Sequence, residues 1–429
     1  MSNNRKKSDS HILELALVVS PTQEKALLVR LDCARQLYNA CLEECLRRLK
    51  LKKESKQYQK ARQLKGNHRT TAFKALSESF EFREYDIHAF AATAKNQCHI
   101  KDHLDVNTCQ KIATRAFKAV QQYSFGKKNG RPRFKGSGQF DSVEGKSNKQ
   151  GIVWREDRVV WSGMEFPVRL DPKDKHGVQA WSLGCRTKYV RIVRRKITGK
   201  NRFYVQLVLE GLPKVKHAVG NSIVGLDPGT RALAGVTCRD AFLEPLCAEL
   251  LPAQAKTRRK QRKMDRSLRA TNPDAFRKDG TIKPRVRLKK SKSYLRTQSE
   301  YAEAKRVEKA HRKSLLGRMA NRVLGMGIHI NIEKVSYRAW QRTFGKSIGL
   351  CSPGMFVSML RRKAESAGGA VNEFPVSNRL SQVCHGCGSI EKKPLSRRWH
   401  DCACGVRAQR DLYSAFLAMN VVGNDLDVV

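Results

Sequence analysis

The sequence predicts a multidomain α+β protein: a helical N-terminal region with a β-barrel or curved sheet, followed by an α/β region that carries a cysteine cluster. Three observations lead to this prediction. The 429 residues exceed the usual size of one domain. The spacing of apolar residues changes near residue 126, from helical to strand-like, and changes again near residue 223. Four cysteines then fall close together between residues 384 and 404.

The charge of the chain predicts a nucleic-acid partner. Lys and Arg number 85 against 39 Asp and Glu, which gives a formal net charge of +46. A charge of this size opposes compaction unless a polyanion accompanies the protein. Hydrophobic residues still make up 40% of the chain, which is enough for a sizeable core. We therefore expect folded nucleic-acid-binding domains and exclude a disordered basic tail.

Two classes of protein are disfavoured. No apolar run approaches the roughly 18–20 residues of a membrane span, and residues 1–8 are followed by no apolar signal-peptide core. The 13 cysteines of such a chain indicate reduced thiols and metal ligands rather than disulfides. A secreted or membrane protein is therefore not expected.

The N-terminal half opens with a predicted strand at 12–19 and a helix that begins at Pro21. Ser20 followed by Gln23 is the pattern of a capping box, and proline suits the first position of a helix. Residues 21–125 keep helical spacing and are basic.

A loop and a group of strands follow this helical region. Residues 126–149 are rich in Gly, Lys, Arg and Ser, which predicts a loop. Residues 151–210 hold strand-like runs, with a hairpin turn predicted at 199–201. We expect a small barrel or curved sheet here, completed by the strand at 12–19.

The C-terminal half predicts alternating strands and helices. Buried strands are expected at 223–230, 233–238 and 327–333, and the segment 251–320 is expected to form basic helices. Two further helices are predicted, one capped by Ser352-Pro353 and closed at Gly368-Gly369, the other covering 412–419. This pattern is typical of an α/β domain.

The cysteine cluster predicts a structural zinc site. Cys384 and Cys387 form a C-x2-C pair, and Cys402 and Cys404 form a C-x-C pair with glycines beside them. Four thiolates on two short knuckles suit a closed tetrahedral site. Because zinc ribbons usually have two C-x2-C pairs, His400 or His385 is an alternative ligand. The remaining alternative is four free thiols.

Three carboxylates are candidates for a magnesium centre. Asp227 and Glu333 each end an apolar strand, and Asp411 opens the last predicted helix. One such residue alone is more often a cap or turn former. Three in an otherwise basic protein suit a nuclease that holds two Mg²⁺ ions about 3.5–4 Å apart across a phosphate. The sequence alone does not establish that they converge.

These motifs, in this order, resemble those of a known family. Residues 224–229 (VGLDPG) resemble the first motif of a RuvC-like nuclease, and residues 331–333 (NIE) resemble the second. Residues 380–388 with 404–405 resemble a zinc ribbon placed before a third motif at Arg410-Asp411. The order is similar to that of TnpB, a transposon-encoded RNA-guided nuclease, and of the compact type V CRISPR effectors. Residues 130–135 (GRPRFK) and 190–209 also resemble the wedge domain of this family.

The resemblance implies a domain layout and a fold class. It implies a helical recognition region and a β-barrel wedge domain, followed by a RuvC-like (RNase H-type) α/β nuclease with an inserted zinc ribbon. The expected boundaries are a wedge strand at 1–20, the helical recognition region at 21–125, the wedge barrel at 126–220, the nuclease with its basic helical segment at 221–380, the ribbon at 381–408, and the last nuclease helix and tail at 409–429.

The resemblance also implies an activity, its cofactors and its partners. It implies an RNA-guided DNA endonuclease, a prokaryotic cytoplasmic protein associated with the nucleoid. Asp227, Glu333 and Asp411 would bind two Mg²⁺ ions, with Asp227 bridging them, and the four cysteines would bind one Zn²⁺. The partners would be a guide RNA and a double-stranded DNA target with a short adjacent motif. A monomer and a homodimer both remain open.

Several positions depart from the family pattern or have two interpretations. Gln409 stands where an aspartate is common, and Tyr413 where an asparagine is common. These departures keep open an RNA-guided regulator with weak or no cleavage. The acidic triad alone also leaves open an unguided transposase or resolvase. The five tryptophans are predicted as core residues first and base-stacking residues second. Six basic residues are the candidate nucleic-acid contacts: Arg133, Lys135, Arg258, Arg259, Arg262 and Arg410.

Overall fold

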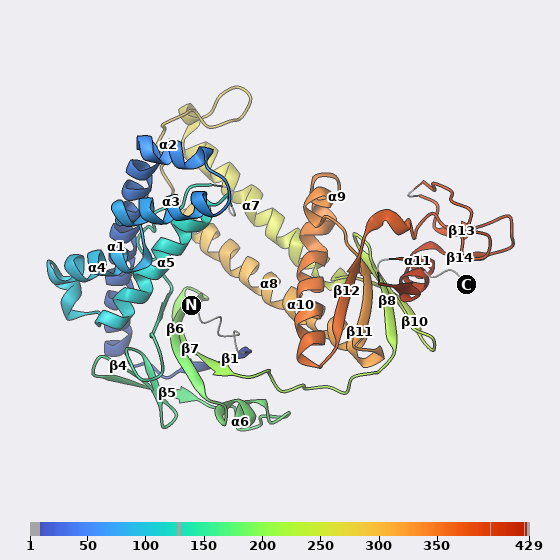
Figure 1. Cartoon of the computed structure of the whole chain (residues 1–429), viewed down its shortest axis with the longest axis horizontal. Helices are drawn as coiled ribbons and strands as arrows, with labels where there is room; N and C mark the ends of the chain where they lie inside the picture. The colour runs from blue at the N-terminus through green and yellow to red at the C-terminus, as the bar shows by residue number, and fades with distance from the viewer. Residues whose placement is uncertain (1–8, 127–129, 395, 424, 427–429) are drawn as a thin grey trace. The chain divides into compact units, whose positions relative to one another are not determined.

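The computed structural model describes residues 9–126, 130–394, 396–423 and 425–426. The chain forms two compact units, Met1–Lys214 and Val215–Val429. The first runs from blue to green in Figure 1, and the second from green to red. The start of the expected wedge strand, residues 1–8, and residues 427–429 of the expected tail lie outside the described residues.

The first unit begins with a strand and a long helix, as predicted. Strand β1 spans Ser10–Leu17 and helix α1 spans Pro21–Glu54. The capping box is present, because the backbone N of Gln23 donates to Ser20 Oγ at 3.2 Å and the backbone N of Ser20 donates to Gln23 Oε1 at 3.0 Å. The remaining helices are α2 (Lys56–Gln63), α3 (Gly66–Ser79), α4 (Glu84–Asn96), α5 (Val106–Ser124) and α6 (Val178–Leu183).

A seven-stranded sheet lies beside these helices, in the order β2-β6-β7-β1-β5-β4-β3. Strand β1 pairs antiparallel with both β7 and β5, so the N-terminal strand is part of this sheet, as predicted. Helices and sheet share one core, in which Leu37, Ala113 and Val205 are buried together. The other strands are β2 (Ser142–Glu144), β3 (Val153–Arg155), β4 (Arg158–Trp161), β5 (Met164–Arg169), β6 (Thr187–Ile197) and β7 (Lys200–Glu210).

The hairpin between β6 and β7 turns one residue earlier than predicted. Thr198 and Gly199 form the turn with φ of 48° and 79°, whereas Lys200 and Asn201 already belong to β7. A two-residue turn with positive φ at both positions matches the right-handed twist of the flanking strands. Gly199 is the one local signal for this turn in the sequence, because threonine rarely adopts positive φ.

Trp161 contacts three parts of the first unit and is a core residue, as predicted. Its side chain is fully buried, and its Nε1 donates to Asp105 Oδ2 at 2.9 Å. The Arg30 guanidinium lies 4.7 Å from the ring centroid and donates to the Trp161 carbonyl at 2.9 Å. The indole therefore ties β4 to α1 and to the start of α5.

The second unit contains a five-stranded sheet in the order β10-β9-β8-β11-β12. Strand β11 pairs parallel with β8 and with β12, and β8 pairs antiparallel with β9. A mixed sheet of this kind fits the α/β region that the resemblance implies. The strands are β8 (Ile223–Pro228), β9 (Ala232–Val236), β10 (Ala241–Pro245), β11 (His329–Glu333) and β12 (Ala370–Phe374).

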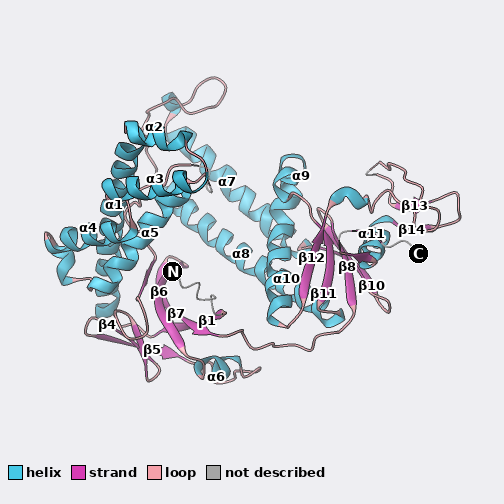
Figure 2. Ribbon diagram, in the orientation of Figure 1, coloured by secondary structure: helices cyan, strands magenta, loops and turns pink. Residues whose placement is uncertain are grey.

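Helices cover both faces of this sheet (Figure 2). Val224 and Ile332 face one side, where they share a core with Leu316 of α8 (Lys292–Met326) and Phe356 of α10 (Pro353–Ser366). Helix α11 (Arg410–Met419) packs on the opposite side. The other long helices are α7 (Leu251–Thr271) and α9 (Tyr337–Cys351).

One predicted helix cap is wrong. Ser352 precedes α10, but its backbone is left-handed with φ of 50° and its side chain makes no capping hydrogen bond. Because α9 ends at Cys351, Ser352 instead ends one helix while starting the next. The predicted closure of α10 is confirmed, since Gly368 has φ of 83° just beyond its end.

No described helix is long and apolar enough to cross a membrane.

Candidate functional site

The pleat of the second sheet places Asp227 and Glu333 on the same face. Side chains alternate between the two faces of a strand. Val224 and Leu226 point into the core beneath α8 and α10, so Gly225 and Asp227 point to the other face. On β11, Asn331 marks that face, because its Nδ2 donates to the carbonyl of Val421, just beyond α11, at 2.9 Å. Glu333, two residues on, therefore lies on the same face as Asp227.

Gly225 lets α11 approach β8 closely. A Cβ atom built at Gly225 would lie 2.0 Å from the carbonyl oxygen of Ala415 and 2.3 Å from the backbone N of Met419. Only glycine fits where two backbones come this near. Asp411 stands in the first turn of α11, one turn before Ala415. The helix thereby carries a third carboxylate to the face that already holds Asp227 and Glu333.

The electrostatics of Asp227 reflect this convergence. Burial, together with the negative charges of Asp411 and Glu333, raises its pKa to about 7, while Arg410 opposes them. Burial also raises the pKa of Glu333. Carboxylates that cannot all ionise without a counter-charge are the kind of group that a divalent cation neutralises.

Two guanidinium groups and an amide surround Asp411. Arg410 Nε lies 3.5 Å from one carboxylate oxygen and Arg398 Nη1 lies 3.8 Å from the other. Gln409 accepts from the backbone N of Leu412 at 2.7 Å, which caps the helix, and its Nε2 lies 3.4 Å from Asp411 Oδ2. Gln409 therefore supplies the cap of α11 where an aspartate is common in the family.

Arg410 is held by the protein rather than presented to solvent. Its side chain is only 11% exposed, and Nη1 donates to the carbonyls of Arg397 at 3.0 Å and Pro394 at 3.3 Å. It joins the start of α11 to the chain segment just before the hairpin of β13 (Trp399–Asp401) and β14 (Arg407–Gln409). This position suits an orienting role near Asp411 better than direct contact with a phosphate.

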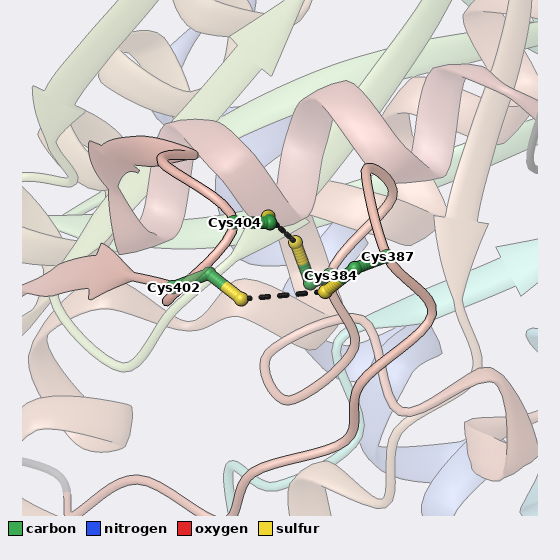
Figure 3. A group of neighbouring side chains, drawn as sticks. All are labelled: Cys384, Cys387, Cys402 and Cys404. Atoms are coloured by element: carbon green, nitrogen blue, oxygen red, sulfur yellow. Dashed lines mark hydrogen bonds between the residues drawn. The ribbon is translucent and has the colours of Figure 1, made fainter.

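The four cysteines of the predicted zinc site converge (Figure 3). Their Sγ atoms all lie within 4.8 Å of one another, with 3.5 Å between Cys384 and Cys404 and between Cys387 and Cys402. A tetrahedral site with Zn–S bonds of about 2.3 Å would separate the sulfurs by about 3.8 Å. The four thiols therefore fit a zinc ion.

Backbone turns shape the two knuckles. The backbone N of Gly388 donates to the carbonyl of Cys384 at 2.9 Å, and that of Gly405 donates to the carbonyl of Cys402 at 3.0 Å. Both glycines have positive φ, 69° and 91°, as the predicted tight knuckles require. The second knuckle is the tip of a hairpin formed by β13 (Trp399–Asp401) and β14 (Arg407–Gln409).

The hydrogen bonds of the cluster favour ionisation of Cys402 and Cys387 but not of Cys404, whose pKa is raised to about 12. A hydrogen bond with Ser389 is the main cause that lowers the pKa of Cys402 to about 6, and a hydrogen bond with Ser389 lowers the pKa of Cys387 as well. Thiolates are the form that binds zinc. Within the described residues, this is the only group of three or more His, Cys, Asp or Glu side chains with ligand atoms this close.

Neither nearby histidine belongs to the zinc group. His385 Nδ1 and the backbone N of His385 both lie 2.8 Å from the hydroxyl of Tyr413. His400 is buried, bonds Lys393 Nζ through Nδ1, and stacks on Tyr413 with ring centroids 4.2 Å apart. Cys402 therefore completes the cluster, and the histidines link it to α11 through Tyr413.

The carboxylates are spaced more widely than the cysteines. Asp227, Glu333 and Asp411 share one face of the sheet, but they do not form a group whose oxygens all lie within 4.8 Å of one another. Two ions about 3.5–4 Å apart do not need such close oxygens, since each ion can take different ligands. Metal binding by this triad stays a prediction.

A basic cavity of about 720 Å³ lies in the first unit. It is bounded by α5 and the strands β2 and β6, and Lys135 also lines it. Asn39 fixes the chain at Lys135, because it accepts from the backbone N at 2.8 Å and donates to the carbonyl at 2.9 Å. Arg133 is exposed nearby in sequence. The cationic lining residues are Lys111, Arg115, Lys118, Lys135 and Arg191.

Helix α7 presents the other predicted contacts. Arg258, Arg259 and Arg262 are all exposed, and Arg258 and Arg262 line a shallow groove of about 510 Å³ along this helix. Exposed arginines on a polar helix suit either a phosphate backbone or solvent. Their contact with nucleic acid stays a prediction.

Sequence reasoning missed Arg398 near Asp411, and it named Tyr413 and Trp399 without their positions. Arg398 lies beside its carboxylate, Tyr413 joins its helix to the zinc knuckle, and Trp399 is 49% exposed rather than buried. A hint was present for Trp399, because Arg397 and Arg398 precede it and a core strand rarely follows two arginines. No sequence signal pairs Tyr413 with His385.

Comparisons with known proteins address the second unit directly. Residues 354–417 match the family described as Cas12f1-like, TNB domain. This segment runs from α10 through the cysteine cluster to α11. A comparison with curated proteins finds no match.

Solved structures extend the likeness to the whole fold. A Cas12f1–sgRNA–target DNA complex aligns with 96% of this chain and 99% of that chain, with a TM-score of 0.50 and 14% identity. The chain thus resembles Cas12f1, a compact type V effector, in fold. Weaker likenesses are a CRISPR-Cas12f ternary complex (93% and 82% covered, TM-score 0.32, 14% identity) and the mini-RNA-guided endonuclease CRISPR-Cas_phi3 (70% and 64% covered, TM-score 0.32, 12% identity).

The resemblance inferred from the motifs is confirmed at this level. The compact type V effectors are the class to which the sequence motifs pointed, and the TNB match covers the expected ribbon and Asp411. The expected multidomain α+β fold class is confirmed as well, as a mixed helix and strand fold with a four-cysteine cluster. The finer domain boundaries stay predictions.

Proposed function

We propose that this protein is an RNA-guided DNA endonuclease with a single RuvC-like acidic centre. The observation that carries the proposal is the placement of Asp227, Glu333 and Asp411 on one face of the α/β sheet, in a chain with the fold of Cas12f1. The Cas12f1 structure is a complex with guide RNA and target DNA. The net charge of +46 supports the same class of partner for this chain.

The acidic residues would have separate roles at the scissile phosphate. Mg²⁺, when bound, supplies charge neutralisation and activation of water. Asp227 is central, since both other carboxylates act on it, and it would contact two ions, while Glu333 and Asp411 would each contact one. Arg398 and Arg410 neutralise part of the charge of Asp411 and orient it from the ribbon side.

The zinc cluster would be structural. Its four thiols leave no open position for substrate, and the second knuckle continues through β14 directly into α11. The ribbon would therefore fix the start of the helix that carries Asp411.

The basic surfaces would hold guide RNA and the RNA–DNA heteroduplex by their backbones, while base pairing selects the target. In the first unit the cavity lined by Lys135 is one candidate, and in the second unit the exposed arginines of α7 are another. Such an effector acts where its RNA and DNA partners are, inside the cell.

The test begins with purification of the chain from cells that carry its native locus and sequencing of the bound RNA. A defined small RNA with one variable end is expected, and DNA that matches this end should be cut when Mg²⁺ is present. Asp227→Ala should abolish cleavage and keep RNA binding. Asp240→Ala, which changes an exposed carboxylate of the same unit, is the matched control and should cleave normally.

Three outcomes would redirect the proposal. Absence of a defined RNA would favour the unguided transposase or resolvase. A guide-dependent complex that binds but does not cut would favour the regulator. Loss of RNA binding in Asp227→Ala would contradict the assigned role, since one carboxylate is a negligible part of a surface with a net charge of +46.

A further inference from the structure

One tryptophan of the second unit lies on the surface beside the acidic centre. Trp399 is 49% exposed, whereas Trp161 is fully buried. It opens strand β13, and in the antiparallel hairpin it pairs with Gln409 of β14. Single exposed hydrophobic residues are common on protein surfaces, so the assignment of Trp399 rests on the groups that surround it.

The pleat of the hairpin decides which way Trp399 points. His400, the next residue, is buried against Tyr413, so Trp399 and Asp401 point to the opposite, outer face. Cross-strand partners share a face, which places Gln409 beside Trp399. Gln409 Nε2 in turn lies 3.4 Å from Asp411 Oδ2. The indole is thus one side chain removed from a carboxylate of the acidic centre.

One arginine lies over the ring of Trp399, and a second precedes Trp399 in the chain. The Arg407 guanidinium lies 5.4 Å from the centroid of Trp399, and its Nε lies 3.1 Å from Asp401 Oδ1. Arg398, the residue before Trp399, is 64% exposed and reaches Asp411. An exposed aromatic face with arginines at its border is the arrangement that binds single-stranded nucleic acid, because the ring stacks a base and the cations contact phosphates.

We propose that Trp399 stacks a base of single-stranded DNA next to the phosphate that enters the acidic centre, with Arg398 and Arg407 on the adjoining phosphates. The proposal rests on the proposed nuclease function and deepens it, because it assigns a strand-positioning residue. It also predicts that the site takes an unpaired strand, since a base in a duplex does not expose its face. Trp399 is a positioning residue here and takes no part in the chemistry.

Binding is tested apart from cleavage. The full chain with Asp227→Ala is irradiated with single-stranded oligothymidylate that carries 5-iododeoxyuridine, and the cross-linked peptide is mapped by mass spectrometry. A cross-link at Trp399 is expected. Cross-links only elsewhere on the basic surface, or at Trp181, which is 39% exposed in the first unit, would overturn the proposal.

Substitutions of Trp399 distinguish stacking of its ring on a base from a purely apolar packing role. At raised salt, which weakens phosphate contacts, Trp399→Ala should bind the same oligonucleotide about 5- to 150-fold more weakly. Trp399→Tyr should restore most of this loss, and Trp399→Leu, which keeps an apolar side chain, should not. Trp181→Ala is the matched control and should bind like the parent chain. Equal binding by Trp399→Ala and Trp399→Tyr would overturn the proposal.

Cleavage and binding by the Asp227→Ala and Trp399→Ala variants distinguish failure of the stacking proposal from failure of the proposed nuclease function. If Asp227→Ala abolishes cleavage while Trp399→Ala cleaves and binds normally, the nuclease stands and the stacking residue is wrong. If Trp399→Ala loses single-strand binding but Asp227→Ala still cleaves, the stacking residue stands and the acidic centre is wrong. A Trp399→Ala chain with changed oligomeric mass and unchanged DNA binding would identify a protein contact instead.

Discussion

The hydroxyl of Tyr413 lies 2.8 Å from the backbone N of His385 and 2.8 Å from its Nδ1. One hydroxyl can satisfy both atoms, by accepting from the backbone N–H and donating to the ring nitrogen. Tyr413 lies on α11, two residues after Asp411, and His385 lies inside the first zinc knuckle. The tyrosine that departs from the family pattern therefore ties the helix of the acidic centre to the zinc ribbon.

Removal of this hydroxyl should loosen the ribbon. Tyr413→Phe keeps the stack on His400 but leaves the backbone N of His385 without its partner, which should cost about 1–3 kcal/mol of unfolding free energy. Denaturant titration, followed by fluorescence, measures the loss. Tyr301→Phe on α8 is the control, because its hydroxyl makes no hydrogen bond among the described residues. Equal stability of the two variants would contradict the role of Tyr413.

The pKa of Asp227 predicts a pH dependence of stability. The folded protein raises this pKa from 3.8 to about 7, so between these values it holds a proton that the unfolded chain releases. Metal-free protein should therefore lose stability as pH rises from about 4 to about 7, by at most about 4 kcal/mol in unfolding free energy.

The Asp227→Asn variant tests whether stability falls, rather than rises, with increasing pH. It cannot ionise, so its thermal midpoint in magnesium-free buffer should exceed that of the parent chain at about pH 8, and the difference should shrink at about pH 5. Mg²⁺ should raise the midpoint of the parent chain more than that of the variant. A variant that is less stable at both pH values would show that the carboxylate is needed for packing instead.

Gly225 should not tolerate a side chain. A Cβ there would overlap the backbone of α11 at Ala415, so Gly225→Ala should displace the helix and destabilise the second unit by several kcal/mol. Gly349→Ala is the matched control, since no atom lies within 4 Å of its added Cβ and α9 is helical there. That control should be neutral or stabilise by about 0.5–1 kcal/mol. The thermal unfolding midpoints of both variants test this prediction, and equal midpoints would contradict it.

Loss of one cysteine ligand should release zinc. Cys384→Ser replaces the buried member of the cluster, and elemental analysis should show a fall from about one zinc per chain to a small fraction of that. Cys238→Ser, an exposed cysteine of the same unit outside the cluster, should retain the metal. Unchanged zinc in Cys384→Ser would show that the metal is elsewhere or absent.

Local signals in the sequence predict local structure well here. The capping box of Ser20 and Gln23 forms as expected, and the apolar runs before Asp227 and Glu333 are strands. These features depend on residues a few positions apart. The four cysteines are predictable for a related reason, because the ligand chemistry itself specifies which residues must meet.

Features that depend on contacts between residues far apart in the chain could not be predicted from the sequence. Nothing near Gly225 in the sequence names Ala415 as its neighbour, and nothing near Asp411 names Arg398. The left-handed Ser352 is a similar case, since its conformation follows from the abrupt succession of α9 and α10. The shared face of two residues on one strand is only partly predictable. The alternation of side chains places Asp227 on the same face as Gly225, but only the packing of α11 shows that this is the face the helix covers.

Because α11 packs directly on Gly225, the acidic centre is completed only after this C-terminal helix has been synthesised. Strand β8 leaves the ribosome long before α11 is made, so the face with Asp227 stays uncovered while the basic helices α7 and α8 have already emerged. A nascent or prematurely terminated chain can therefore attract nucleic acid through its charge but lacks the third carboxylate. The acidic face is therefore complete only after the C-terminal helix has docked on β8.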